Sequence, residues 1–207
     1  FFQLFRFFPI FRIFSDLDSW SVSTIGDYLA DDIRTGSIST DSKEFEEAEK
    51  SVKNKIELLV NNKGTKTVDY FHKKLGKIIW NKCGMSRNVK ELNEAIEEIQ
   101  LLRKDFYKNI SIPGTENSFN EPLAKAVRVS DFLELGELFA KDALERTESC
   151  GGHFREESQT KEGEALRDDK NFAFVSAWEN KGEPSEAILH KEELIYENIE
   201  LKTRSYK

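Results

Sequence analysis

The stretch VKELNEAIEEIQLLRKDF, residues 89–106, decides the fold class, because its apolar residues recur every three or four positions. These apolar positions are Val89, Leu92, Ile96, Ile99, Leu102 and Phe106. The spacing places them along one face of an α-helix, while charged residues cover the opposite face. Ser86 or Asn88 offers the cap at the start of this helix. A helix of this kind must bury its apolar face against other elements, so the stretch predicts a helical bundle.

Two further helices of the same kind precede this stretch. The first begins at Asp41 or Ser42 and ends before Gly64, with an apolar stripe made of Phe45, Ala48, Val52, Ile56 and Leu59. The second ends near Cys83 and Gly84, with an apolar face made of Val68, Phe71, Leu75, Ile78 and Ile79. Because the connections are short, neighbouring helices are expected to run antiparallel. The three helices together predict a spectrin-like, antiparallel three-helix bundle.

A fourth and longer helix is expected over residues 122–148, and it leads directly into the stretch TESCGGHFREE, residues 147–157. Its apolar positions are Leu123, Val127, Phe132, Leu135, Leu138, Phe139 and Leu144. The pattern then changes, because NFAFVSAW, residues 171–178, alternates with the period of two that is typical of a strand. One or two further strands are expected after it. The predicted fold is therefore mainly α: the three-helix bundle, a long fourth helix and a small C-terminal β segment.

The chain is expected to fall into four parts, at residues 1–22, 23–40, 41–150 and 151–207. The first part is an atypical Phe-rich segment, and FFQLFRFFPIFRIF holds seven of the sixteen phenylalanines of the chain. It lacks the small-residue cleavage site of a signal peptide, and charges and Pro9 interrupt it too often for a spanning helix. Two interpretations remain, a non-native or disordered segment and a surface-binding helix kinked at Pro9. The other parts are a residual helix with a linker, the helical bundle domain, and a loop followed by the β tail.

The overall composition fits a globular helical chain that is soluble. Of the 207 residues, 33% are charged and 38% are hydrophobic, and the net charge is −7. This acidic balance argues against nucleic acid as a partner, because binding to nucleic acid requires a basic surface. Two cysteines far apart in the sequence do not form a disulfide framework, which favours a reducing compartment.

The stretch 147–157 concentrates the residue types that carry chemistry, and three interpretations compete. Cys150 and His153 could begin a metal site, but such a site needs three or four ligands, and the other candidates are scattered (His72, His190 and Cys83). Cys150 and His153 could also form a nucleophile and its base, although no third member of a triad stands out. The structural interpretation is a glycine turn in which His153 and Cys150 make local hydrogen bonds. Arg155 beside His153 could hold a carboxylate, and the same pair could equally bind an Asp or Glu of a neighbouring domain.

No phosphate-binding glycine motif occurs in the chain, but an extended pattern resembles a known family. AVRVSDFLELGELFAKDALERTESCGGHFREE, residues 126–157, resembles the C-terminal region of the flavoprotein subunits of succinate dehydrogenase and fumarate reductase. In that family a long helix ends in an E-S-R-G-A-H-x-R-E turn; here Cys150 replaces the usual arginine and Gly152 the usual alanine. Residues 24–36, 69–102 and 172–194 also resemble the family, so the likeness extends over about nine tenths of the chain.

The resemblance implies a parent subunit that interconverts succinate and fumarate with FAD as its cofactor. Many members of the family hold FAD covalently on a histidine. It implies that residues 23–40 are the remainder of the FAD domain. The FAD and capping-domain motifs of the family are missing from these 207 residues, so the chain is expected to be a structural fragment without catalytic, cofactor-binding or metal-binding residues. The isolated chain is then expected to bind no FAD and to lack succinate oxidation activity. The implied partners are the FAD and capping domains, an iron–sulfur subunit and a membrane anchor, at the cytoplasmic face of the inner membrane.

Within this resemblance, five residues of the turn are candidates for contact with a neighbouring domain: Glu148, Gly151, Gly152, His153 and Arg155. If they have this role, His153 and Arg155 should be more exposed and less paired in this chain than in the full subunit, and finding both buried and fully hydrogen-bonded within the chain would count against it. The alternative function is a stand-alone helical interaction module whose Phe-rich N-terminus docks on a membrane or on a partner helix.

Overall fold

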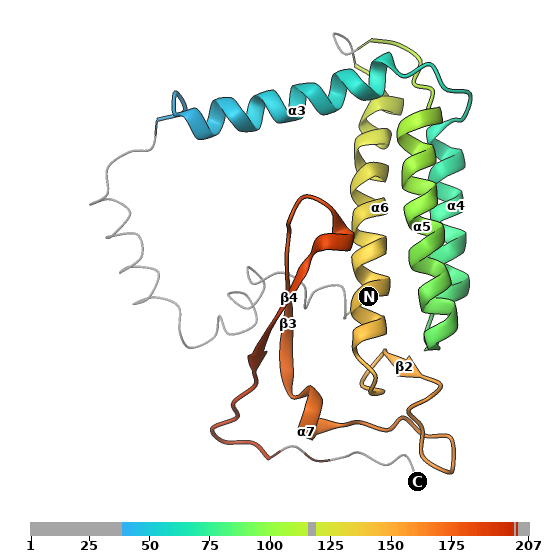
Figure 1. The fold of residues 1–207 in the computed structure, drawn as a ribbon, viewed down its shortest axis with the longest axis vertical. Coiled ribbons are helices and arrows are strands. Elements are labelled where there is room, and N and C mark those ends of the chain that lie inside the picture. The colour runs from blue at the N-terminus through green and yellow to red at the C-terminus, as the bar shows by residue number, and fades with distance from the viewer. Residues whose placement is uncertain (1–38, 116–118, 201, 203–207) are drawn as a thin grey trace. The chain divides into compact units, whose positions relative to one another are not determined.

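The computed structural model describes residues 39–115, 119–200 and 202 (Figure 1). The expected Phe-rich segment and the helix over residues 24–36 lie outside the described residues. The chain divides into two compact units at Leu58 and Leu59, inside helix α3 (Lys43–Asn61). The second unit contains the helices α4 (Val68–Lys82), α5 (Val89–Asn109), α6 (Glu121–Glu145) and α7 (Asp169–Phe172), the strands β1 (Ser86–Arg87), β2 (Phe154–Arg155), β3 (Phe174–Glu179) and β4 (Ile188–Glu193), and the 3₁₀ helix η2 (Pro184–Glu186).

Helices α4, α5 and α6 pack side by side and run in alternating directions (Figure 1). Each helix begins at a side chain that accepts a hydrogen bond from the first turn, and these caps are Thr67, Asn88 and Asn120. The core between the helices is closed by fully buried residues such as Phe71, Ile99 and Leu133. The rings of Phe71 and Phe106 meet edge to face with their centres 5.2 Å apart.

The prediction of a mainly α fold with a small β segment is confirmed, but the membership of the bundle differs from the prediction. Helix α6, which was expected as a fourth helix beside the bundle, packs against both α4 and α5 and is a member of the bundle of the second unit. The buried face of α6 is rich in small residues, and Gly136 allows a close approach: a Cβ atom there would lie 3.3 Å from Cδ1 of Leu75. Of the larger residues assigned to its apolar face, Leu123 is buried as predicted, whereas Phe132 and Leu135 are each 43% exposed.

Two small sheets complete the second unit. Strands β1 and β2 pair in parallel, with Arg87 opposite Arg155, and this pair joins the start of α5 to the segment that follows α6. Strands β3 and β4 form an antiparallel hairpin in which Phe174 pairs with Glu193 and Glu179 with Ile188. The predicted alternating strand is therefore present, although Phe172 belongs to α7 instead.

The hairpin is fastened to the last turns of α6 by two adjacent side chains. The Lys141 ammonium donates hydrogen bonds of 3.0 to 3.2 Å to three carbonyl oxygens at the hairpin turn, those of Pro184, Ser185 and Ala187. The same ammonium lies 5.0 Å from the centre of the Trp178 ring, and Trp178 Nε1 donates to Asp142 Oδ1 at 2.9 Å. The C-terminal end of α6 is therefore the point at which the bundle and the β tail meet.

Candidate functional site

The stretch 147–157 forms a tight turn directly after α6. The backbone N–H of Cys150 donates to the carbonyl of His153 at 2.8 Å, and the N–H of His153 donates to the carbonyl of Cys150 at 3.1 Å. Gly151 lies between them with a φ of 60°, a left-handed conformation that favours glycine. Both Gly151 and Gly152 are exposed, so the turn points its backbone outward and returns the chain towards α6.

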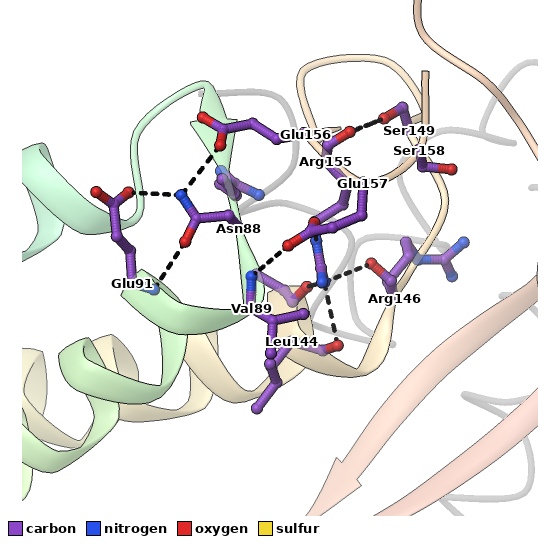
Figure 2. A network of polar contacts seen from close by, with 12 residues as sticks. Asn88, Val89, Glu91, Leu144, Arg146, Ser149, Arg155, Glu156, Glu157 and Ser158 are labelled. Atoms are coloured by element: carbon purple, nitrogen blue, oxygen red, sulfur yellow. Dashed lines mark hydrogen bonds and ion pairs between the residues drawn. The ribbon is translucent and has the colours of Figure 1, made fainter. Parts of the chain in front are cut away.

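Arg155 is the centre of the site and is only 1% exposed. Its Nη1 atom donates to the carbonyl oxygens of Ala143 at 2.8 Å, Leu144 at 3.2 Å and Arg146 at 3.3 Å (Figure 2). The last carbonyls of a helix have no partner within the helix, and they carry the negative end of its dipole. The guanidinium of Arg155 therefore caps the C-terminal end of α6 from a residue outside that helix.

The two glutamates that follow Arg155 bind at the start of α5, and Glu157 caps it. Glu157 accepts from the backbone N–H of Val89 at 2.7 Å and from Arg155 Nε at 3.1 Å (Figure 2). Glu156 accepts from Asn88 Nδ2 at 3.1 Å. Partial burial raises the pKa of Glu157, but the hydrogen bonds from Val89, from its own backbone and from Arg155 outweigh burial and leave that pKa below its ordinary value. The stretch thus places the positive charge of Arg155 at the C-terminal end of α6 and the negative charge of Glu157 at the N-terminal end of α5.

Removing the carboxylate of Glu157 is expected to destabilise the domain. The Glu157→Ala substitution leaves the first N–H of α5 without its acceptor and should lower the free energy of unfolding by about 1–2 kcal/mol. Urea unfolding followed by circular dichroism measures the change. Glu162→Ala is the matched control, since Glu162 is an exposed residue in the loop that follows, and it should change this free energy by less than about 0.5 kcal/mol. Equal losses in the two variants would show that Glu157 is not a cap.

His153 is 2% exposed and has a partner at each ring nitrogen. Nδ1 lies 2.6 Å from Arg87 Nη1, and Nε2 lies 2.8 Å from the carbonyl oxygen of Arg146. Arginine can only donate, so Nδ1 is the acceptor and Nε2 carries the proton of a neutral imidazole. Burial lowers the pKa of His153 to about 4, and the charges of the surrounding arginines contribute to that shift.

Glu148 connects the turn with the β tail. Its carboxylate is buried and accepts from Arg146 Nη1 at 2.7 Å and from the backbone N–H of Asp168 at 2.9 Å. Arg146 also donates to the carbonyl oxygens of Phe172 at 3.2 Å and Phe174 at 3.1 Å. The pair of Glu148 and Arg146 therefore orients the segment that enters β3.

The burial and pairing of His153 and Arg155 count against the domain contact that was assigned to them. Both are buried, and both find their partners inside the chain, at the end of α6 and beside β1. Glu148 is also buried and bonded within the chain. The domain contact assigned to Gly151 and Gly152, which are exposed, stays a prediction.

The arrangement also bears on the two chemical interpretations of Cys150. Both ring nitrogens of His153 are engaged, with Arg87 and with the Arg146 carbonyl, so this histidine is not placed to take a proton from a thiol. Among the described residues, no group of three or more His, Cys, Asp or Glu side chains could hold a metal ion.

Arg87 was missed by reasoning from the sequence. It is 6% exposed, donates from Nε to the carbonyl of Gly84 at 2.7 Å, and lies 4.9 Å from the centre of the Phe139 ring. The only signal was its place in the segment CGMSRN, which resembles the family. Its partner His153 lies 66 residues away, and no local pattern could have connected them.

The fold of the helical part of this chain is also found in larger chains of known structure. Among solved structures, the FrdA chain of Escherichia coli quinol fumarate reductase superimposes with a TM-score of 0.68 at 22% identity, covering 81% of this chain and 28% of that chain. The Mycobacterium smegmatis Sdh1 complex superimposes with a TM-score of 0.58 at 21% identity, covering 72% and 24%. At these identities the likeness shows the fold.

Sequence comparison shows the family. The family model described as "Fumarate reductase flavoprotein C-term" matches residues 72–206, and the chain therefore belongs to this family. The fumarate reductase flavoprotein subunit of Helicobacter pylori strain J99 is 30% identical over 131 residues, which is 63% of this chain and 18% of that subunit. The subunit of Proteus vulgaris is 28% identical over 123 residues, which is 59% and 20%. The chain thus spans about a fifth of the length of these relatives.

The first of these comparison structures is a quinol fumarate reductase, and the second is an Sdh1 complex. Within residues 39–115 and 119–200, no helix has the length and apolar character that crossing a membrane requires.

Proposed function

We propose that this chain is the C-terminal helical domain of a flavoprotein subunit of fumarate reductase or succinate dehydrogenase, and that its role is structural. The match of the family model over residues 72–206 carries the proposal. The polar site supports it, because the charged groups of Arg155, Glu157 and Glu148 are bonded to helix ends and backbone. Groups held in this way position elements of the fold instead of acting on a substrate.

The parent subunit would interconvert succinate and fumarate, with FAD supplying the hydride chemistry. The N-terminal ends of the three bundle helices do not fit the FAD phosphates. Phosphate groups often bind to the free backbone N–H groups at helix N-termini. At the N-termini of α4, α5 and α6, side chains of this chain already accept from such groups, namely Thr67, Asn88 and Asn120. The cofactor would therefore bind to the FAD domain of the parent. Its other partners would be the capping domain, an iron–sulfur subunit and a membrane anchor, at the cytoplasmic face of the inner membrane.

A chimeric subunit tests this function. The chain replaces the corresponding C-terminal segment of the Helicobacter pylori fumarate reductase flavoprotein subunit, and the control is that subunit with the segment deleted. We expect the chimera to show a flavin absorbance spectrum and to reduce fumarate with a reduced viologen dye, and the deleted control to do neither. The isolated chain should show no flavin absorbance and no succinate oxidation. Flavin bound to the isolated chain, or a folded chimera without activity, would contradict the proposal.

A further inference from the structure

The side of α4 that faces away from the bundle carries an arrangement that neither the core nor the polar site uses. It consists of Lys73, Gly76, Lys77 and Trp80, and we call it the Gly76 face. These residues are separated by three and four positions and therefore lie on one side of the helix. The opposite side of α4 carries its buried residues, Val68, Phe71, Leu75 and Ile78.

Trp80 is the prominent apolar group of this face and is 83% exposed. Its indole N–H has no hydrogen-bond partner among the residues that the structure describes. Tryptophan is enriched among the residues that contribute most to binding between proteins, because it offers a large rigid surface. A tryptophan so fully exposed on a charged helix contributes almost nothing to the stability of this chain, which points to a contact outside it.

Gly76 lies one turn before Trp80 and has no structural reason within the described chain. A glycine in the middle of a helix destabilises it relative to alanine. The φ of Gly76 is not positive, and a Cβ atom added there would find nothing within 4 Å. Gly136 of α6 is the contrast, because its own neighbours crowd it. A glycine on an open helix surface leaves room for the backbone of another helix to approach closely.

The Gly76 face is mainly basic, in contrast to the chain as a whole, although Asp69 lies one turn before Lys73 on the same side of α4. Lys73 and Lys77 flank the glycine, both are exposed, and neither has an ion pair within the described part of the chain. Lys74 adds a third positive charge at the edge, above the Tyr70 ring. Since the whole chain carries a net charge of −7, a local basic surface with an apolar centre is complementary to an acidic apolar segment.

We propose that the Gly76 face binds an acidic amphipathic helix of a partner protein, with Trp80 against its apolar stripe and the lysines beside its carboxylates. The glycine favours a helix over a lipid surface as the partner. Its missing side chain lets the backbone of a helix approach closely, whereas a fluid lipid surface gains no specific contact there. The net negative charge of the chain also opposes binding to an anionic membrane. This interaction goes beyond the proposed structural role and does not depend on which reaction the parent subunit catalyses.

Two synthetic helical peptides with the same leucine stripe test the chemistry, one with glutamates and one with lysines at the flanking positions. The isotope-labelled chain of 207 residues is titrated with each peptide and followed by its amide NMR signals. The glutamate peptide should shift the signals of residues 73–80 and bind at least about tenfold more tightly than the lysine peptide at low salt. Added salt should reduce this difference.

Variants of the face separate binding from folding. Trp80→Ala should weaken binding of the glutamate peptide by about tenfold or more. Gly76→Ala should raise the thermal midpoint of the chain by about 2–4 °C, because alanine favours the helix, and yet weaken the binding. The control is Leu101→Ala on α5, which removes an exposed apolar side chain elsewhere and should leave the affinity unchanged.

Three results would overturn the proposal. One is equal binding of the two peptides, and another is a Gly76→Ala chain that is more stable and binds as tightly as the natural one. The third is binding to phosphatidylserine vesicles without binding to the glutamate peptide, which would identify a membrane surface instead.

Discussion

Replacing Arg155 by methionine is expected to lower the free energy of unfolding by about 3–5 kcal/mol, the largest effect of any single substitution in the polar site. Methionine fills a similar volume but donates no hydrogen bond. Three carbonyl oxygens at the end of α6 then lose their shared donor, and Glu157 loses the cation beside it. These carbonyls are close to the buried guanidinium, so water replaces the lost bonds poorly.

Urea unfolding followed by circular dichroism measures this loss. The matched control is Arg167→Met, because Arg167 is also paired with an acid two residues later, Asp169, but at a more exposed position. The Arg167→Met substitution should lower the free energy of unfolding by less than about 1 kcal/mol, because exposed ion pairs contribute little to stability. Arg155→Lys keeps the charge without the fork of donors and should fall between the two. If Arg155→Met cost no more than Arg167→Met, Arg155 would not be the cap of α6.

The second large effect is a loss of stability in acid that depends on His153. The unfolded chain takes up a proton at this histidine near pH 6.5, whereas the folded chain does so only near pH 4. The contribution of the neutral imidazole is therefore complete above pH 6.5 and is lost as the pH falls from 6.5 to about 4. A depression of this size corresponds to about 3 kcal/mol.

A His153→Gln variant isolates this contribution. Glutamine offers an acceptor and a donor on one side chain but does not titrate, so the free energy of unfolding should fall less steeply between pH 6.5 and pH 4. A parallel His72→Gln variant, at an exposed position on α4, should follow the natural chain. Identical pH curves for the natural chain and the His153 variant would show that His153 does not titrate differently in the folded state.

Much of the fold could be predicted from periodicity, and the resemblance to the family could be read from an extended pattern. In α5 the predicted stripe largely succeeded, because its residues Leu92, Ile99, Leu102 and Phe106 are buried, although Val89 is 44% exposed. Helix α6 is the opposite case, because the residues that let it pack are small, such as Ala126, Gly136 and Ala140. A glycine or alanine face gives little hydrophobic signal, although it allows the closest packing.

The role of the polar turn could not be predicted, because its partners are main-chain atoms and distant side chains. Arg155 binds carbonyl oxygens, which every residue carries, so no residue type marks the far end of the interaction. The pairing of His153 with Arg87 depends on two segments that only the folded bundle brings together. The sequence singled out His153 and Arg155, but the structure gives both of them partners within this chain instead of in another domain.

The parallel pair of β1 and β2 has a consequence for the order of folding. It joins residues that are 68 positions apart in the chain, Ser86 with Phe154 and Arg87 with Arg155. The contacts of α4 with α5, and of α5 with α6, connect neighbours in the chain and close shorter loops, which form faster. We therefore expect the three helices to associate before the rate-limiting step. The strand pair then closes late, so that substitutions at Arg87 or Arg155 accelerate unfolding and leave the refolding rate almost unchanged.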